Sequence, residues 1–211
     1  ILERPDVDYA SIKVSSLVSQ ISTWDTAGTV ERCLTRLRPL YETARASTPH
    51  AFVNLDMEEY RDLEMTMEVF TTLLSEPQFH DLEAGIVLQA YLPDALPALE
   101  RLVDFALARR AAGGAPIKVR LVKGANLAME RVEAVMHGWE QAPYPTKGDV
   151  DANYLRCIER ALRPELAGAL RHEVPHWLHM APMAGAVMQV VPAHFRHGGG
   201  GAYYVYLRRA G

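Results

Sequence analysis

The sequence predicts an α/β protein built on a (βα)8 TIM-like barrel. Four short apolar runs each precede a helical pattern of apolar residues, which is typical of repeated strand–helix units and a parallel sheet. The strand starts are separated by roughly 30 to 40 residues, a spacing that suits an eightfold barrel of about 250 residues. No Gly-x-Gly-x-x-Gly turn follows the first run, which counts against a doubly wound open sheet.

The first two predicted units lie in the N-terminal part of the chain. The first strand spans Tyr9 to Ser15, and its helix, beginning near Thr29, has apolar residues at helical spacing: Val30, Cys33, Leu34, Leu37, Tyr41 and Ala44. The second strand spans Ala51 to Leu55. Asp56 follows it as a candidate cap for a helix whose apolar positions are Leu63, Met67, Phe70 and Leu74.

The third and fourth units follow the same pattern. The run from Gly85 to Tyr91 is continuously apolar, as expected of a strand buried on both faces, and Asp94 is positioned to cap a helix with Leu99, Leu102, Val103 and Ala106. The fourth strand spans Ile117 to Val122. Its helix has apolar residues at Met129, Val132, Met136 and Trp139, and a further helix spans Val150 to Leu162.

The segment after Arg163 contains clustered histidines, spaced prolines and four consecutive glycines, with no clear strand followed by a helix. The sequence thus supports four strand–helix units directly. We therefore expect a barrel that is incomplete or distorted.

Composition places the chain among ordinary globular proteins. Its 211 residues are 49% hydrophobic, enough for one sizeable core, so residues 1–211 are expected to form one domain. With 22 Lys and Arg against 26 Asp and Glu, and no basic block interleaved with aromatics, nothing indicates a nucleic-acid surface.

Two features bear on the cellular compartment. The chain has two cysteines, and both Cys33 and Cys157 fall on apolar helical faces, which predicts buried thiols and a reducing, cytoplasmic setting. Residues 1–6 lack the features of a signal peptide. The segment from Val174 to Phe195 lacks Asp, Glu, Lys and Arg, but its prolines and histidines make it a poor membrane span.

Polar residues interrupt the predicted strands near their carboxyl ends, where parallel barrels place their active sites. They are Lys13, Asp56, Gln89, Arg120, Lys123 and Gly124. Charged groups in apolar runs are costly to bury unless they are paired or used, so this set predicts a functional site.

Each of these positions also has a purely structural interpretation. Arg120 and Asp56 could form a structural ion pair, and Asp56 could cap a helix. Lys13 could extend its ammonium group to solvent at the strand end. Gly124 could simply serve a turn.

Four motifs make the interpretation specific. They are the runs from Tyr9 to Ser15, Phe52 to Glu59, Ile86 to Tyr91 and Arg120 to Ala125. In order and spacing they resemble strands two to five of the flavin-dependent proline dehydrogenase barrel, including the form fused to an aldehyde dehydrogenase in proline utilisation A proteins. The resemblance covers residues 5–163, whereas 164–211 diverge: the family's sixth-strand Thr-His-Asn is not found, and the first strand is missing before Asp8.

The resemblance implies a cofactor and a reaction. Family members bind FAD noncovalently, oxidise L-proline to pyrroline-5-carboxylate and pass electrons to a quinone. By this resemblance, Gln89 and Arg120 contact the flavin, and Val122, Lys123 and Gly124 line the cofactor. Ala125 borders the substrate.

The resemblance also assigns the substrate carboxylate and ring. Lys13 matches the family lysine near the carboxylate, and Asp56 matches an aspartate that organises the cationic site. The family's arginine pair on the last helix corresponds to Arg208 and Arg209, with Tyr204 at i, i+4 to Arg208 and Tyr206 as the competing assignment. Leu178 is expected over the substrate ring.

The expected partners are L-proline and a quinone. The resemblance leaves open peripheral contact with the inner face of a membrane, and an aldehyde dehydrogenase domain in a longer parent chain.

Three other interpretations stay open from the residues alone. An incomplete, noncatalytic barrel fragment could bind a partner through unpaired strand edges. Lys13 or Lys123 could form a Schiff base if burial lowered its pKa. His172, His176 and His179 have a spacing that could collect a metal, but Pro175 interrupts that helix and surface histidines are the preferred reading, so no metal is expected.

Overall fold

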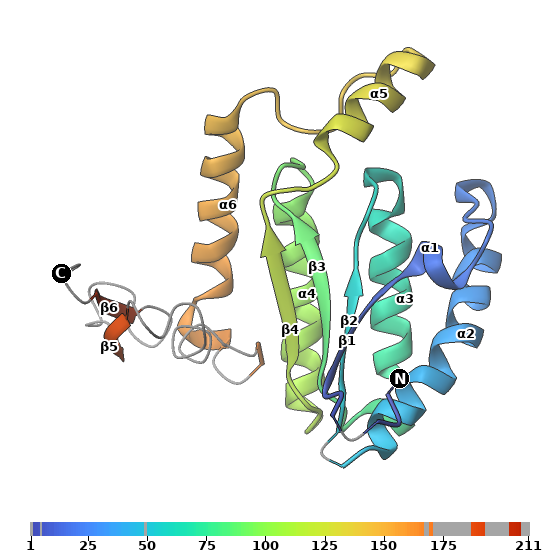
Figure 1. Cartoon of the computed structure of the whole chain (residues 1–211), viewed down its shortest axis with the longest axis vertical. Coiled ribbons are helices and arrows are strands. Elements are labelled where there is room, and N and C mark those ends of the chain that lie inside the picture. Colours follow the sequence, from blue (N-terminus) through green and yellow to red (C-terminus); the bar gives the residue numbers. More distant parts are fainter. Residues whose placement is uncertain are drawn as a thin grey trace.

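The computed structural model describes residues 2–4, 6–48, 50–166, 169–170, 187–192 and 203–207. Its main body is a four-stranded sheet in the order β1–β2–β3–β4, and all neighbouring strands run parallel. These strands are β1 (Tyr9–Lys13), β2 (Phe52–Asp56), β3 (Ala84–Gln89) and β4 (Ile117–Val122). The predicted parallel α/β sheet is confirmed, and within the described residues it forms an open part of a barrel (Figure 1).

The helices are α1 (Val14–Leu17), α2 (Thr26–Ala46), α3 (Leu63–Ser75), α4 (Ala95–Ala111), α5 (Leu127–His137) and α6 (Lys147–Ala161). Short 3-10 turns are η1 (Thr23–Asp25), η2 (Tyr60–Asp62), η3 (Pro77–Phe79) and η4 (Pro164–Leu166). Helix α2 packs on β2, α4 on β3 and α6 on β4, and each of α2, α3, α4 and α6 contacts the next helix in this row. Figure 1 shows these helices beside the sheet and α5 projecting beyond its end.

No helix in the described part of the chain is long and apolar enough to cross a membrane.

Side chains on successive strand residues point to opposite faces of the sheet, so that one face is apolar and the other carries polar residues. The strand residues that face the helices are apolar and fully buried, among them Val53, Leu55, Ile86 and Leu88. Burying each such side chain stabilises the fold by roughly 1.5 to 3 kcal/mol. Because side chains alternate between the two faces of a strand, the polar residues at the intervening positions share the opposite face.

The predicted helix faces are confirmed for α2, α3 and α4. Their buried residues include Val30, Cys33, Leu34, Leu37, Tyr41, Ala44, Leu63, Met67, Phe70, Leu74, Leu99, Leu102, Val103 and Ala106. Cys33 and Cys157 are fully buried free thiols, as predicted. Burial raises the pKa of both thiols.

The predicted helix cap is wrong for Asp56, and for Asp94 it is confirmed in position only. Asp56 does not cap a helix, because α3 begins only at Leu63 with Asp62 in the N-cap position, and the Asp56 carboxylate instead accepts a hydrogen bond from Arg120. Asp94 does occupy the N-cap position of α4, but its side chain makes no capping hydrogen bond.

The packing predicted for α5 is also wrong. Its apolar positions Met129, Val132 and Met136, and Trp139 just beyond it, are exposed rather than packed on the core. The inward side instead presents Glu130, whose carboxylate accepts a hydrogen bond from the Tyr60 N–H at 2.7 Å. A specific polar contact therefore overrides the periodic apolar pattern.

The divergent C-terminal part contains β5 (Val187–Pro192) and β6 (Tyr203–Leu207), which pair antiparallel. Tyr204 and Tyr206 thus lie in a strand, and the helical spacing assumed for Tyr204 is wrong. The run of aromatic and β-branched residues favours extended backbone. Leu178, Arg208 and Arg209 lie outside the described residues.

A single parallel bridge joins Leu170 to Ile117 on the free side of β4. The Ile117 N–H donates to the Ala169 carbonyl at 3.1 Å. Residues 169–170 therefore lie beside the start of β4, although no family motif marks that position in the sequence.

Arg109 on α4 is a buried arginine that ties several segments together. Its guanidinium donates to the carbonyl oxygens of Leu74, Phe79, His80, Leu82 and Ala115. Only 6% of the residue is exposed. Buried carbonyls without a donor are costly. The Arg109 guanidinium therefore holds three segments against α4: the end of α3, the turn η3, and the residues just before β4.

Replacing Arg109 with Lys should destabilise the protein, because one ammonium group cannot satisfy five carbonyls arranged around a planar fork. We expect the free energy of unfolding in urea to fall by about 2 to 4 kcal/mol. The matched control is Arg36→Lys on the exposed side of α2, which should change it by less than about 0.5 kcal/mol. A loss at Arg109 no larger than that of the control would contradict the clamp.

Asp62 is a buried carboxyl with an unsatisfied oxygen. It is 8% exposed, and its Oδ1 has no hydrogen-bond partner among the described residues. Burial, aided by the charge of Glu59, raises the pKa of Asp62 to about 6. The native protein therefore holds this proton more tightly than the unfolded chain, whose Asp pKa is about 3.9.

The penalty of ionising Asp62 should be absent below about pH 4, grow as the pH rises to about 6, and be complete at pH 7. Asp62→Asn should therefore raise the free energy of unfolding by about 2 to 3 kcal/mol at neutral pH and leave it unchanged near about pH 3. Denaturant unfolding across this range measures the effect, with exposed Asp104→Asn as control. If Asp62→Asn raised the free energy of unfolding equally at every pH, the raised pKa of Asp62 would not be the cause.

Candidate active site at the carboxyl ends of the strands

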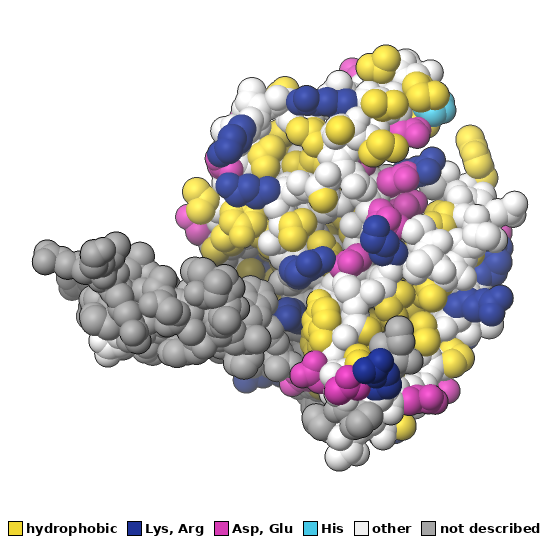
Figure 2. Space-filling model, viewed as in Figure 1, with side chains coloured by type: hydrophobic (Ala, Val, Ile, Leu, Met, Phe, Trp, Pro, Cys, Tyr) yellow, Lys and Arg dark blue, Asp and Glu magenta, His cyan; other side chains and the backbone are white. Residues whose placement is uncertain are grey.

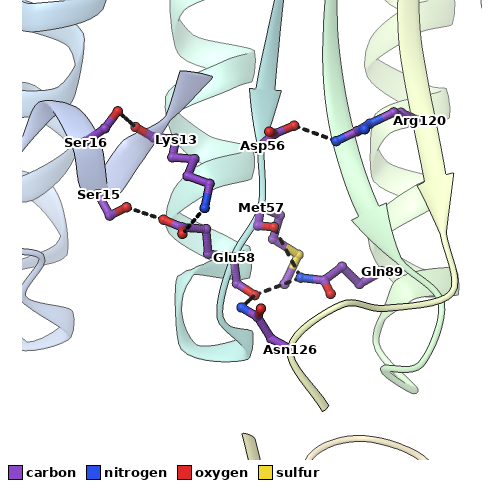
Figure 3. A network of polar contacts seen from close by, with 9 residues as sticks. All are labelled: Lys13, Ser15, Ser16, Asp56, Met57, Glu58, Gln89, Arg120 and Asn126. Atoms are coloured by element: carbon purple, nitrogen blue, oxygen red, sulfur yellow. Dashed lines mark hydrogen bonds and ion pairs between the residues drawn. The ribbon is translucent and has the colours of Figure 1, made fainter. Parts of the chain in front are cut away.

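The strand register brings four predicted site residues to one end and one face of the sheet. Lys13 lies opposite Asp56 in the β1–β2 pairing. In the β3–β4 pairing, Gln89 lies opposite Val122, and Arg120 is two residues before Val122 and so shares its face. Figure 3 shows the contact between Asp56 and Arg120 at the level of the strands, and the contacts of Lys13 and Gln89 with residues 57 and 58 nearer the strand ends.

The Asp56–Arg120 ion pair is one half of this site. The Arg120 guanidinium donates to Asp56 Oδ1 at 2.7 Å, and Asn54 Nδ2 donates to the same oxygen at 2.8 Å. The Asp56 side chain is 20% exposed and that of Arg120 41%. The ion pair considered from the sequence is therefore present. Arg120 Nε is buried with no hydrogen-bond partner in the described part of the chain. The rest of the side chain is accessible, since 41% of it is exposed.

The Lys13–Glu58 ion pair is the other half. Lys13 Nζ donates to Glu58 Oε1 at 2.8 Å, and the Ser15 hydroxyl donates to Oε2 of the same carboxylate (Figure 3). Partial burial raises the pKa of Glu58, but the hydrogen bonds from Lys13 and Ser15 outweigh it, so that pKa lies below its ordinary value. Both groups are therefore charged at neutral pH.

This pairing argues against Lys13 as a Schiff-base nucleophile. The hydrogen bond to Glu58, with the charge of that carboxylate, raises the pKa of Lys13 above its ordinary value. A Schiff-base lysine needs the opposite shift, because only the neutral amine attacks a carbonyl.

Gln89 joins the loops that follow β2 and β4. Its Nε2 donates to the carbonyls of Met57 at 3.2 Å and Glu58 at 2.8 Å, and its Oε1 accepts from the Ala125 N–H at 3.3 Å. Asn126 adds a second link, since its Nδ2 donates to the Glu58 carbonyl at 2.7 Å. Gln89 is 2% exposed, so this carboxamide is a fixed part of the site.

Sequence reasoning missed four residues of this network: Ser15, Asn54, Glu58 and Asn126. All of them stand inside the motifs that carry the family resemblance or directly beside them. Glu58 is the most central, because its carboxylate and its carbonyl both accept hydrogen bonds within the site. The sequence does offer a signal for Glu58, because it is a carboxylate two residues after Asp56, just beyond the end of a strand.

Lys123 extends away from these ion pairs toward α6. Its ammonium group pairs with Asp151 and lies 5.5 Å from the centre of the Tyr154 ring. A cavity of about 300 Å³ opens beside Lys123 and Gly124, and its lining includes the basic residues Arg131 and Lys147. Such a lining suits an anionic group.

Gly124 is required by its conformation. Its φ is +139°, a region that favours glycine, and a Cβ at this position would collide with the Tyr91 ring. Both the positive φ and the closeness of the Tyr91 ring therefore require glycine at position 124.

No group of three or more His, Cys, Asp or Glu residues that could hold a metal occurs in the described ranges. His172, His176 and His179 lie outside them, as do Leu178, Arg208 and Arg209. Tyr204 is described only as part of β6.

Comparison with known proteins agrees with the geometry. The family described as proline dehydrogenase matches residues 2–184. "Bifunctional protein PutA" of Salmonella typhimurium is 31% identical over 189 residues, covering 86% of this chain and 14% of that protein. "Proline dehydrogenase" of Deinococcus radiodurans is 32% identical over 155 residues, covering 74% of this chain and 41% of that protein.

Solved structures show the same likeness. Proline utilization A from Corynebacterium freiburgense has a TM-score of 0.78 and 58% identity, covering 81% of this chain and 18% of that one. Proline utilization A from Bdellovibrio bacteriovorus, inactivated by N-propargylglycine, has a TM-score of 0.69 and 38% identity over 76% of this chain and 16% of its own. The chain thus spans less than half the length of these relatives. It belongs to the proline dehydrogenase family.

Proposed function

We propose that this chain forms the part of a proline dehydrogenase that binds FAD and L-proline. The observation behind the proposal is the convergence of Lys13, Asp56, Gln89 and Arg120 at the carboxyl ends of the strands in a chain of this family. FAD would supply a two-electron oxidant, so that removal of a hydride from C5 of L-proline and of a proton from its nitrogen would give pyrroline-5-carboxylate. A quinone is the proposed final electron acceptor.

Arg120 is the proposed donor to the flavin. Asp56 Oδ1 accepts from Arg120 Nη2, and Asn54 Nδ2 holds that oxygen by donating to it as well. The Arg120 side chain is 41% exposed, so its guanidinium stays accessible to a bound group. A fixed cation here stabilises the negative charge that arrives with a hydride. Gln89 is the second proposed flavin contact, since an acceptor site of its Oε1 remains beyond the bond from Ala125.

The cavity beside Lys123 and Gly124 supports a place for an anionic part of FAD. Lys123, Arg131 and Lys147 supply positive charge, and Asp151 offsets part of it. Val122, Lys123 and Gly124 are the proposed lining of the cofactor at this end of β4.

Lys13 is the proposed partner of the substrate carboxylate. An ammonium group has three donors, so Lys13 can keep its bond to Glu58 at 2.8 Å while donating to a second carboxylate. Asp56 orients the neighbouring cation, and Ala125 borders the substrate. Arg208 and Arg209 as the carboxylate clamp, with Tyr204 and Leu178 beside the substrate, remain predictions.

The larger context is also a proposal. The relatives called PutA are described as bifunctional, which favours an aldehyde dehydrogenase domain in a longer parent chain. Cytoplasmic location with peripheral contact to a membrane fits a quinone acceptor.

Binding of FAD to the purified chain, followed by anaerobic loss of its visible absorption on adding L-proline, tests this function. Arg120→Ala should weaken FAD binding at least tenfold, or about 1.4 kcal/mol, because the cation that Asp56 holds in place is lost. Arg45→Ala, which removes a surface ion pair with Asp81, is the matched control. Equal FAD affinity and equal reduction in the Arg120 variant would remove its role.

Glu58→Gln should lower the proline concentration that half-reduces the bound flavin, by about threefold to fivefold, because a carboxylate near the substrate carboxylate disappears. The backbone carbonyl that accepts from Gln89 and Asn126 is kept, so FAD affinity should change less than twofold. Glu59→Gln, whose carboxylate pairs with Arg61 instead, controls for the change of charge. A higher half-reducing concentration would mean that Glu58 chiefly positions Lys13.

A further inference from the structure

An apolar surface lies on the outward side of α5. It consists of Met129, Val132, Val135 and Met136 of the helix and of Trp139 just after it, and we call these residues the α5 surface. Their exposed fractions lie between 50% and 76%. Figure 2 shows hydrophobic side chains gathered over this projecting end of the molecule, with acidic side chains beside them.

The inward side of α5 is fixed by polar contacts. Glu130 accepts from the Tyr60 N–H at 2.7 Å and from the Tyr91 hydroxyl at 3.5 Å, and Ala134 is buried. Turning the apolar stripe inward would break these contacts and expose Glu130's partners. The orientation of the helix is therefore a property of the fold.

Trp139 is also held in place. Gly138 ends the helix with a φ of +67°, and the Trp139 N–H donates to the Ala134 carbonyl at 2.9 Å. The Trp139 ring stacks on His137 with 4.4 Å between ring centres. A large aromatic side chain is thus pre-positioned at the surface with 61% of it exposed, which is typical of a binding anchor.

A hollow of about 260 Å³ borders this surface, between α5 and η2. Four of its lining residues are acidic, namely Glu59, Glu130, Glu133 and Glu140, and one is basic, Arg61. Arg61 is already paired with Glu59 at 2.6 Å. Glu133 Oε2 lies 3.4 Å from His137 Nδ1. In the part of the chain that the structure describes, none of Glu130, Glu133 and Glu140 has a Lys or Arg within ion-pair distance, so the hollow has an excess of negative charge.

We propose that the α5 surface binds an amphipathic helix of another polypeptide, whose apolar side covers Val132, Val135, Met136 and Trp139 and whose basic side chain enters the acidic hollow. Charge complementarity selects this occupant. A second copy of the same surface would set Glu133 and Glu140 against their own counterparts, and an anionic membrane would be repelled by the same carboxylates. The proposal is independent of the oxidation of proline.

Two synthetic helical peptides with the same leucine face, one flanked by lysines and one by glutamates, test the proposal by calorimetric titration into the full chain. The lysine peptide should bind with a dissociation constant in the micromolar range, and the glutamate peptide at least tenfold more weakly. Equal binding of the two peptides, or no binding of either, would overturn the proposal.

Substitutions locate the site. The double variant Val135→Asp with Met136→Asp should weaken binding of the lysine peptide at least tenfold, and Glu133→Lys with Glu140→Lys should reverse the preference between peptides. Both pairs are exposed or at the surface, and circular dichroism checks their fold. Leu155→Asp, at an exposed apolar position on α6, is the control and should leave affinity unchanged.

Two further outcomes would replace the proposed occupant. Sedimentation that shows self-association of the parent chain, abolished by the Val135 and Met136 variant, would assign the surface to a second copy. Binding to phosphatidylglycerol vesicles that the same variant abolishes would assign it to a membrane. Either result contradicts a basic helix as the partner.

Discussion

The parallel register of β1 to β4 is the constraint on which the rest of the structure depends. It sets Lys13 opposite Asp56 and Gln89 opposite Val122, so that polar residues distant in sequence project from one face at one end. The apolar residues between them point the other way and hold the helices. A shift of one residue in any strand would exchange the two faces, burying the charges and exposing the core.

Within that frame, Glu58 connects the parts of the site. Its carboxylate accepts from Lys13 and Ser15, while its carbonyl accepts from Gln89 and Asn126. The loops after β2 and β4 are therefore tied to each other and to the end of β1. Such a network holds charged groups in place before a ligand arrives, which lowers the cost of ordering them on binding.

The sequence predicted what depends on local periodicity and on strand ends. The apolar faces of α2, α3 and α4, and the grouping of Lys13, Asp56, Gln89 and Arg120, follow from residue spacing and from the rule for parallel sheets. The outward stripe of α5 could not be predicted, because a tertiary contact of Glu130 with Tyr60 decides it. For Asp56 the sequence allows both a helix cap and an ion pair with Arg120, and only the folded sheet decides for the ion pair. The strand at Tyr204 contradicts a helical spacing that came from the resemblance alone.

A double-mutant cycle at Asp56 and Arg120 most directly tests whether the strand register assembles the charged site in the free protein. The single variants Asp56→Asn and Arg120→Gln and their combination are compared by the free energy of unfolding in urea. A coupling energy of about 1 kcal/mol or more is expected for this partly buried, hydrogen-bonded pair, with none between Asp104 and Arg120. Additive effects within about 0.3 kcal/mol at Asp56 and Arg120 would contradict a preassembled site.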